Sequence, residues 1–307
     1  MESNILVDPY SRKITSLRVS ITSQCNLNCF YCHNEGQSGH ETDMSAELII
    51  NIINTAASLG IKRVKFSGGE PLLRNDFEQI LAALPELKNV SATTNGVLLS
   101  KRAAGLKAAG LDRINISLDT LDPKVYSKIC GCNGNTHQKV LDGIYAAVEA
   151  GLIPVKLNFV MLKGINSDEL DDMIEFIKRF NGNVILQIIE PMDFGSVQHV
   201  SMDDIEQKLI SRASSVIERK MHRRKKYLID GSEVELVRPI DNSEFCANCN
   251  RLRVTADGKL KPCLLKNDNL VDVSGASEQD LPSLFIQAAK RREPFYRGKL
   301  VNRKQEL

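Results

Sequence analysis

Short apolar-rich segments alternate with segments of helical spacing along the first two thirds of the chain. Residues 49–56, 77–84 and 170–177 each place apolar side chains at i, i+3, i+4 and i+7, which predicts amphipathic helices. Strands are predicted between such segments, at residues 17–22, 63–67, 90–95, 113–119, 155–161 and 184–190. This alternation predicts an α/β fold built on a parallel sheet.

The predicted strands alternate between apolar and polar residues. In the first strand, Leu17, Val19 and Ile21 share one face, and Arg18 and Ser20 lie on the other. Helices must cover the apolar faces, so the polar faces look inward. A closed eight-stranded barrel would be filled with Val, Ile and Leu, and unpaired buried cations would be costly. We therefore expect a curved sheet or partial barrel around an anionic ligand. An antiparallel sheet with one wet face is the alternative, which the intervening helices disfavour.

The strand–helix pattern weakens after about residue 200. We expect a core over residues 1–225 and a smaller C-terminal unit over residues 226–307, with strand-like stretches at 234–237 and 252–255. A basic run at residues 219–226 is interpreted as a solvated linker or helix face, or as a phosphate contact.

The overall charge excludes some classes of partner. The chain has 40 basic and 38 acidic residues, a net charge of +2, so no global field favours nucleic acid or a membrane surface. No apolar run approaches the length of about 18 residues that a membrane span requires, and the first ten residues do not resemble a signal peptide. We therefore expect a cytoplasmic protein with reduced thiols, whose eight cysteines are candidates for metal binding or catalysis.

Three of these cysteines directly follow the first predicted strand, as Cys25-x3-Cys29-x2-Cys32. A structural zinc site needs four ligands, and His33 could supply the fourth. Three thiolates and one open position instead suit an iron–sulfur cluster with one iron available to an added ligand.

The spacing of Cys25, Cys29 and Cys32, with Tyr31 before the last cysteine, resembles the signature of the radical S-adenosylmethionine enzymes. Residues 67–71 (SGGEP) are similar to the methionine-binding stretch of that family. The resemblance implies a [4Fe–4S] cluster whose free iron binds S-adenosylmethionine and whose electron generates a 5′-deoxyadenosyl radical.

The glycines of this stretch, Gly68 and Gly69, would let the backbone approach the ligand closely. Glu70 would accept a hydrogen bond from the ammonium group of the ligand. Tyr31 would place its ring beside the cluster, or pack in the core.

A second triad, Cys246-x2-Cys249-x13-Cys263, lies in the C-terminal part. It again lacks an obvious fourth ligand, although His222 or Asp241 could complete a zinc site. Within it, Arg251 and Arg253 alternate, so on a strand both project to one side. Guanidinium groups in this arrangement suit phosphate, unless the pair lies exposed on an edge strand.

The stretch from 245 to 258 (FCANCNRLRVTADG), together with both triads, resembles the GTP 3′,8-cyclase family, and the similarity extends from about residue 14 to 265. The resemblance implies an incomplete (βα)6 barrel of the triosephosphate-isomerase type, with a C-terminal domain that closes its mouth. Each triad would carry a [4Fe–4S] cluster, and the second would anchor the guanine of GTP. The product would be (8S)-3′,8-cyclo-7,8-dihydroguanosine 5′-triphosphate, the first intermediate of molybdenum cofactor biosynthesis.

The same resemblance implies site residues and partners. No catalytic side chain is assigned beyond the first cluster. A downstream pyranopterin-forming enzyme, an unidentified electron donor and a possible homodimer are implied. S-adenosylmethionine would contact Tyr31, Gly68, Gly69, Glu70, Ser117 and Met192. GTP would contact Arg18, Lys65, Thr93, Lys156, Arg251 and Arg253, and also Arg63, which shares a strand face with Lys65.

Some positions depart from the family pattern. Gln187 stands where an arginine is often found, so a phosphate contact is lost or moved. Cys130 and Cys132 match no family motif and are interpreted as free thiols, or as a metal or redox pair. Residues 303–307 do not match the Gly-Gly tail of many members.

Two other functions remain open from the sequence. One is a two-cluster radical enzyme that acts on a peptide, which would usually contain more C-terminal cysteines and would not need the arginine pair. The other is a zinc-stabilised nucleotide-binding module without catalysis.

Overall fold

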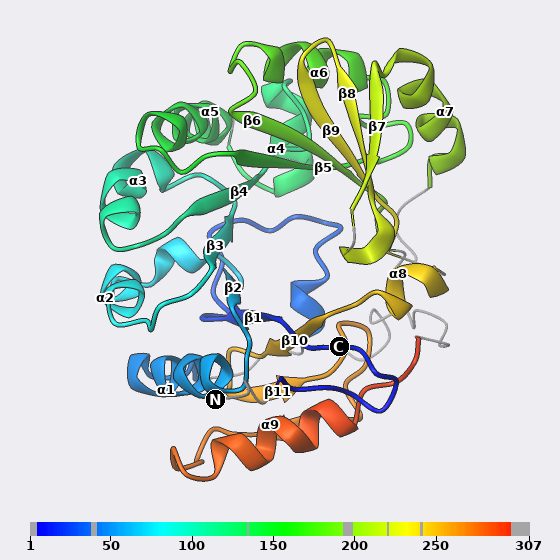
Figure 1. Ribbon diagram of the computed structural model, residues 1–307. Coiled ribbons are helices and arrows are strands. Elements are labelled where there is room, and N and C mark those ends of the chain that lie inside the picture. Colours follow the sequence, from blue (N-terminus) through cyan, green and yellow to red (C-terminus); the bar gives the residue numbers. More distant parts are fainter. Residues whose placement is uncertain are drawn as a thin grey trace.

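The predicted strands lie in one continuous sheet in the computed structural model, which describes residues 5–37, 42–133, 135–192, 199–219, 221–239 and 242–295. The sheet of the described part has twelve strands, in the order β12-β11-β10-β1-β2-β3-β4-β5-β6-β9-β8-β7. It curves into an arc, with helices along its outer side (Figure 1).

The central strands are parallel and agree with the predicted strands to within two residues at each end. They are β1 (Ser16–Ser20), β2 (Arg63–Ser67), β3 (Asn89–Thr94), β4 (Arg113–Ser117), β5 (Val155–Val160) and β6 (Val184–Ile189). The larger helices and the 3-10 turns between and after them are α1 (Ala46–Ser58), α2 (Phe77–Ala82), α3 (Leu99–Ala108), α4 (Pro123–Cys130), α5 (Asn135–Glu149), α6 (Leu170–Lys178), α7 (Met202–Arg212), η1 (Asn34–Gly36) and η2 (Pro71–Leu73).

The outer face of the sheet carries the hydrophobic core, as the alternating pattern predicts. Leu17 and Val19 are fully buried there, with the apolar side of α1, including Ile49 and Ile53. Burying each such side chain stabilises the fold by about 1.5–3 kcal/mol. The polar face is thereby left to look into the arc, and no antiparallel pairing occurs among β1 to β6.

The strands of the C-terminal part extend both edges of this sheet. At one edge, β10 (Arg251–Val254) pairs in parallel with β1 and is followed by β11 (Lys259–Lys261) and β12 (Val271–Asp272). At the other edge, β9 pairs in parallel with β6. The elements that complete this part are β7 (Ser215–Glu218), η3 (Met221–Arg223), β8 (Lys225–Ile229), β9 (Ser232–Val237), α8 (Ser243–Ala247) and α9 (Leu281–Lys290).

The boundary expected between residues 225 and 226 falls inside β8. The division into two units therefore stays a prediction, since strands from both sides of it share one sheet. Within the described residues, no helix has both the length and the apolar character that a membrane crossing needs.

The end of α4 fixes the loop that follows β1. Gly131 ends this helix in the left-handed conformation, and a Cβ there would lie 3.0 Å from the Asn28 carbonyl oxygen. The Asn28 N–H donates to the Cys130 carbonyl at 2.9 Å. The loop with the first cysteine triad is thus attached to α4 by main-chain contacts.

Candidate active site

A single cavity of about 1170 Å³ is enclosed by the polar face of the sheet and by both cysteine triads. Its lining includes the cysteines of each triad and residues from β1 to β6 and β10. Segments that are more than 200 residues apart in the sequence therefore share one site.

The loop of the first triad rests on the Gly68–Gly69 pair. The Gly69 N–H donates to the Thr22 carbonyl at 2.8 Å, and a Cβ on Gly69 would lie 2.1 Å from the Gln24 carbonyl oxygen. Gly68 has φ +151°, which a side chain rarely tolerates. These glycines line the cavity, and their small size also lets two backbone segments meet next to Cys25.

Glu70 is held by hydrogen bonds within the protein. It is fully buried and does not line the cavity. Its Oε1 accepts from the Leu72 N–H at 2.9 Å and the Thr94 hydroxyl at 2.6 Å, and its Oε2 accepts from the Asn95 N–H at 2.6 Å. In this structure the carboxylate ties the SGGEP stretch to the end of β3, and its contact with the ammonium group of the ligand stays a prediction.

Tyr31 lines the cavity and also packs against the core. Its hydroxyl donates to Asp119, whose other carboxylate oxygen accepts from the Val160 N–H at 2.8 Å. Burial raises the pKa of Asp119 to about 6, although the hydrogen bond from Tyr31 opposes this. The ring is thereby held in one orientation beside Cys32.

Cys130 lies against the first triad. A hydrogen bond with Cys130, together with burial, raises the pKa of the Cys29 thiol. All eight cysteines lie in the described residues, and none forms a disulfide. The interpretation of Cys130 and Cys132 as free thiols stays a prediction, and Cys130 is buried directly beside a predicted cluster ligand.

In the second triad, Cys246 lies in α8, Cys249 precedes β10 and Cys263 follows β11. The His222 ring stacks on Phe245, with ring centroids 3.7 Å apart and an interplanar angle of 12°. Burial and the nearby Arg251 lower the pKa of His222 to about 2. Asp241, the other zinc ligand considered, lies outside the described residues.

In the described ranges, no group of three or more Cys, His, Asp or Glu side chains is arranged to hold a single metal ion. The zinc ligands predicted at His33 and His222 stay predictions. Each triad offers three thiols to one shared cavity, which suits a polynuclear cluster with one iron left open.

One group of cations surrounds Glu35, three residues after Cys32. Arg18 and Arg253 are adjacent in the β1–β10 register. They contact the two oxygens of Glu35 at 3.1 and 2.8 Å. Burial alone would raise the pKa of Glu35, but the two guanidinium groups lower it to about 2. Arg251 projects from the same side of β10, as its alternation with Arg253 predicts.

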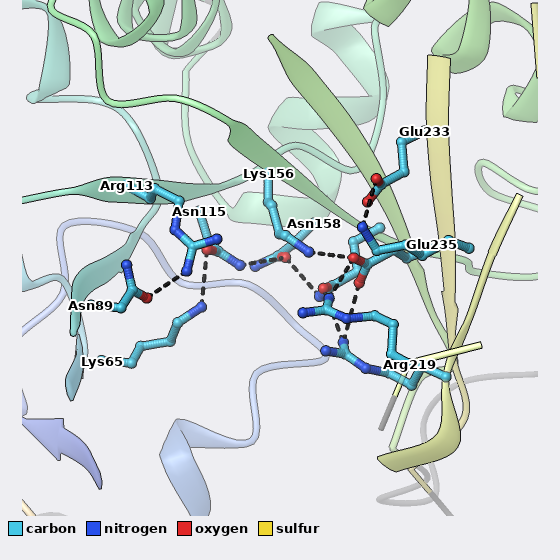
Figure 2. Close-up of polar contacts among 12 residues, drawn as sticks. Lys65, Asn89, Arg113, Asn115, Lys156, Asn158, Arg219, Glu233 and Glu235 are labelled. Atoms are coloured by element: carbon cyan, nitrogen blue, oxygen red, sulfur yellow. Dashed lines mark hydrogen bonds and ion pairs between the residues drawn. The ribbon is translucent and has the colours of Figure 1, made fainter. Parts of the chain in front are cut away.

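A second group surrounds the fully buried Glu235 on β9 (Figure 2). The Lys156 Nζ and the Arg219 guanidinium contact its Oε1 at 2.5 and 2.6 Å. Arg224 lies 3.5 Å from its Oε2 and donates to Gln187 at 3.2 Å. Three cations share one carboxylate, so the group retains positive charge.

Amides connect this group to Lys65. The Lys65 Nζ donates to Asn115 at 2.9 Å, and Asn115 donates to Asn158 (Figure 2). Gln187 also donates to Asn158, at 3.1 Å. Burial, reinforced by Arg18 and other cations, lowers the pKa of Lys65 well below its ordinary value. Its protein partner is a neutral amide, so an anionic ligand beside Lys65 would favour the charged form of this side chain.

The cavity contains every predicted site residue except Glu70. Among them are Arg63, Thr93, Ser117 and Met192. The sequence reasoning missed Arg219, Arg224, Glu35, Glu235 and Arg113. The basic run at 219–226 was the available signal for the first two, but its spacing alone could not show which members face inward.

Two family models match the chain. The Radical SAM superfamily model matches residues 19–177, and the Molybdenum Cofactor Synthesis C model matches residues 184–297. A curated relative from Methanosarcina mazei, "Probable GTP 3′,8-cyclase", is 59% identical over 306 residues, covering 96% of this chain and 91% of the relative. The chain belongs to the GTP 3′,8-cyclase family of radical S-adenosylmethionine enzymes.

A more distant relative also matches nearly the full length of the chain. A protein of the same name from Archaeoglobus fulgidus is 45% identical, covering 96% of this chain and all of the relative. Enzymes of the family use S-adenosylmethionine and two [4Fe–4S] clusters, as expected from the two triads.

Solved structures confirm the fold. Streptococcus suis SuiB bound to S-adenosylmethionine has a TM-score of 0.61 at 16% identity, over 83% of this chain and 61% of that one. The structure of anSMEcpe with bound AdoMet has a TM-score of 0.56 at 16% identity, over 88% of this chain and 80% of that one. The predicted α/β partial barrel is confirmed.

Proposed function

We propose that this chain is a GTP 3′,8-cyclase that joins the ribose C3′ of GTP to guanine C8, in the first step of molybdenum cofactor biosynthesis. The observation that carries the proposal is the single cavity onto which both cysteine triads and the inward cations open. Family membership supports the same reaction.

The first triad would hold the cluster that binds S-adenosylmethionine. The chemistry that this cluster supplies when bound is one-electron cleavage of S-adenosylmethionine. Tyr31, Gly68, Gly69, Ser117 and Met192 line the cavity from several elements, which is the arrangement needed to position the ligand. Glu70, which follows these glycines, would accept from the ammonium group of the ligand, and its carboxylate is oriented by hydrogen bonds from Leu72, Thr94 and Asn95.

The second triad would hold the cluster that orients guanine. Cys246, Cys249 and Cys263 line the same cavity as Arg251 and Arg253. With the guanine base held by this cluster, the phosphates of GTP would lie near the cations on the polar face of the sheet, because the triad and those strands line the same cavity.

Phosphate binding is assigned to two groups of cations. Arg18, Arg251 and Arg253 form one, and Lys65, Lys156, Arg219 and Arg224 form the other, with Arg63 and Thr93 alongside. Gln187 stands where an arginine is often found in the family, and Arg224 would supply a guanidinium at the same place, because it donates a hydrogen bond to the Gln187 amide oxygen. The Arg224 Nε is buried without a hydrogen-bond partner in the described residues, so it has a donor available for an anion.

A matched pair of variants tests this assignment. Arg224→Gln should weaken GTP binding about tenfold or more, the usual effect of losing one charge-assisted hydrogen bond, and should leave guanosine binding unchanged. Arg223→Gln, at an exposed neighbour paired with Glu218, should change neither. Equal GTP affinity of Arg224→Gln and wild type would contradict the role of Arg224.

Anaerobic incubation with GTP and S-adenosylmethionine tests the function itself. The reconstituted protein should contain about eight irons per chain and should form 5′-deoxyadenosine and a cyclised nucleotide. Absence of both products would contradict the cyclase. About two zinc ions and no iron per chain would instead support the non-catalytic nucleotide-binding module.

The partners and the assembly of the protein are proposed from the family resemblance alone. A downstream pyranopterin-forming enzyme would consume the product, and an electron donor would supply the first cluster. Cytoplasmic location, a homodimer, and the division at residues 225/226 stay predictions. The C-terminal residues compared with the Gly-Gly tail, 303–307, lie outside the described residues.

A further inference from the structure

Two arginines from opposite ends of the chain donate to main-chain carbonyls of the second triad. The Arg12 Nη1 donates to the Cys246 carbonyl at 2.9 Å, and the Arg292 Nη2 donates to the Cys249 carbonyl at 2.8 Å. The same Cys246 carbonyl accepts from the Cys249 N–H at 3.1 Å. The backbone of two adjacent cluster ligands is therefore fixed by guanidinium groups that lie outside the triad sequence.

Asp8 joins the two arginines. Its Oδ2 lies 2.6 Å from the Arg12 Nε and 2.9 Å from the Arg292 Nη1. The exposed fractions of the side chains of Asp8, Arg292 and Arg12 are 0%, 3% and 10%. Removing one member of such a buried charged group leaves the others uncompensated, which is strongly destabilising. The three residues therefore act as one unit.

A tight turn at residues 8–12 holds Asp8 and Arg12 in place. The Asp8 Oδ1 accepts from the backbone N–H groups of Tyr10 and Arg12, at 3.0 and 2.9 Å, and Ser11 has φ +62° in the turn between them. Arg12 also donates to the carbonyls of Glu293 and Pro294 at 2.6 and 2.9 Å. The turn at 8–12 is thus attached to the segment that follows α9.

Arg12 differs from the cations assigned to phosphate. A guanidinium has five N–H donors, and four hydrogen bonds within the protein are formed by Arg12, one from Nε, two from Nη1 and one from Nη2. Little donor capacity is left for a substrate, so Arg12 acts on the protein itself.

We infer that Asp8, Arg12 and Arg292 form a clamp that positions Cys246 and Cys249 to hold the second cluster. The inference rests on the proposed function, since it assumes a cluster on this triad. Fixed carbonyls set the directions in which the two cysteine side chains leave the main chain. Asp8, Arg12 and Arg292 are positioning residues, because they act through the cysteines.

Selective loss of one cluster tests the clamp. We expect reconstituted Arg12→Gln and Arg292→Gln to lose about half of the roughly eight irons to a chelator at least about tenfold faster than wild type. The first cluster should remain, so the formation of 5′-deoxyadenosine from S-adenosylmethionine without nucleotide should persist. Arg12→Lys, which keeps the charge with fewer donors, should be intermediate and provides a folded variant if Arg12→Gln aggregates.

Arg102→Gln is the matched control. Arg102 also pairs with a carboxylate, Glu78, and donates to two carbonyls, those of Leu72 and Arg74, at 2.6 and 3.0 Å. Its loss should lower the melting temperature without selective loss of iron. Iron retention in Arg12→Gln and Arg292→Gln equal to that of wild type and Arg102→Gln would overturn the clamp. A wild-type protein that binds only one cluster would instead overturn the proposed function, and the clamp with it.

Discussion

Replacing Glu235 with Gln removes one charge from the centre of a buried cation group while keeping the shape of the side chain. Glu235 is fully buried and contacts Lys156, Arg219 and Arg224 (Figure 2). Burial alone would raise the pKa of this carboxyl, but Lys156 and the two arginines lower it from an ordinary 4.5 to about 2. The charged form is therefore the stable one in the folded protein.

This difference in pKa sets the expected loss of stability. At about 1.4 kcal/mol per pH unit, a fall from 4.5 to about 2 corresponds to about 3 kcal/mol. Because the folded pKa is the lower one, the stabilisation is complete above pH 4.5 and is lost as pH falls toward 2. At pH 7 the full amount should therefore disappear in Glu235→Gln, in line with the range of about 3–5 kcal/mol for breaking a buried ion pair.

Thermal melting of the reconstituted protein at pH 7 measures this loss. At about 2 °C per kcal/mol, Glu235→Gln should melt about 6 °C below wild type. Glu233→Gln, two residues away on the same strand, is the control. Glu233 is 28% exposed and pairs with Lys226 at 2.6 Å, so the cost should stay below about 1 kcal/mol. Equal shifts in the two variants would refute the reasoning, because the effect would then not depend on the buried group.

Three further outcomes are expected. Burial lowers the pKa of Lys156 to about 8 despite its ion pair with Glu235. GTP affinity measured by calorimetry should therefore fall as pH rises through about 8, and Lys156→Arg should abolish the fall; the same decline in both proteins would exclude Lys156 as its source. Arg251→Ala should lower kcat/KM about 100-fold, equivalent to about 3 kcal/mol, with both clusters retained; loss of iron would show a structural role. Gly69→Ala would place a Cβ 2.1 Å from the Gln24 carbonyl oxygen. It should therefore displace Cys25 and lower the iron content by about half, and full iron retention would contradict the packing role of this glycine.

The fold was largely predictable because its information is local. Strands with a polar face require a polar interior, and Arg18, Lys65 and Lys156 do face the cavity. The attachment of β9 and β10 to opposite edges of the sheet was not predictable. It depends on pairings between residues that are far apart in sequence, as in the register of Arg253 with Arg18, and periodicity within a segment carries no information about its partner.

The cations of the site were easier to predict than its carboxylates. A cation on the inward face of a strand indicates an anionic ligand, and the strand alternation shows which residues face inward. Glu35 lies on a 3-10 turn with φ +50°, where no such alternation shows whether its side chain faces the cavity. Glu70 was assigned to a ligand because its motif borders the site. Two of its three internal hydrogen bonds come from Thr94 and Asn95 at the end of β3, which lies more than twenty residues further along the chain.

The carboxylates of Glu35 and of the buried Glu235 explain how so many cations coexist before an anion binds. Glu35 joins Arg18 of β1 to Arg253 of β10, and Glu235 of β9 joins Lys156 of β5 to Arg219. Each carboxylate therefore links an added edge of the sheet to a central strand. A bound triphosphate would supply negative charge to pair with the cations that these two carboxylates do not neutralise. If these cations bind GTP as proposed, the stability of the C-terminal strands and the affinity for GTP depend on the same side chains, and substitutions at Glu35 or Glu235 should alter both together.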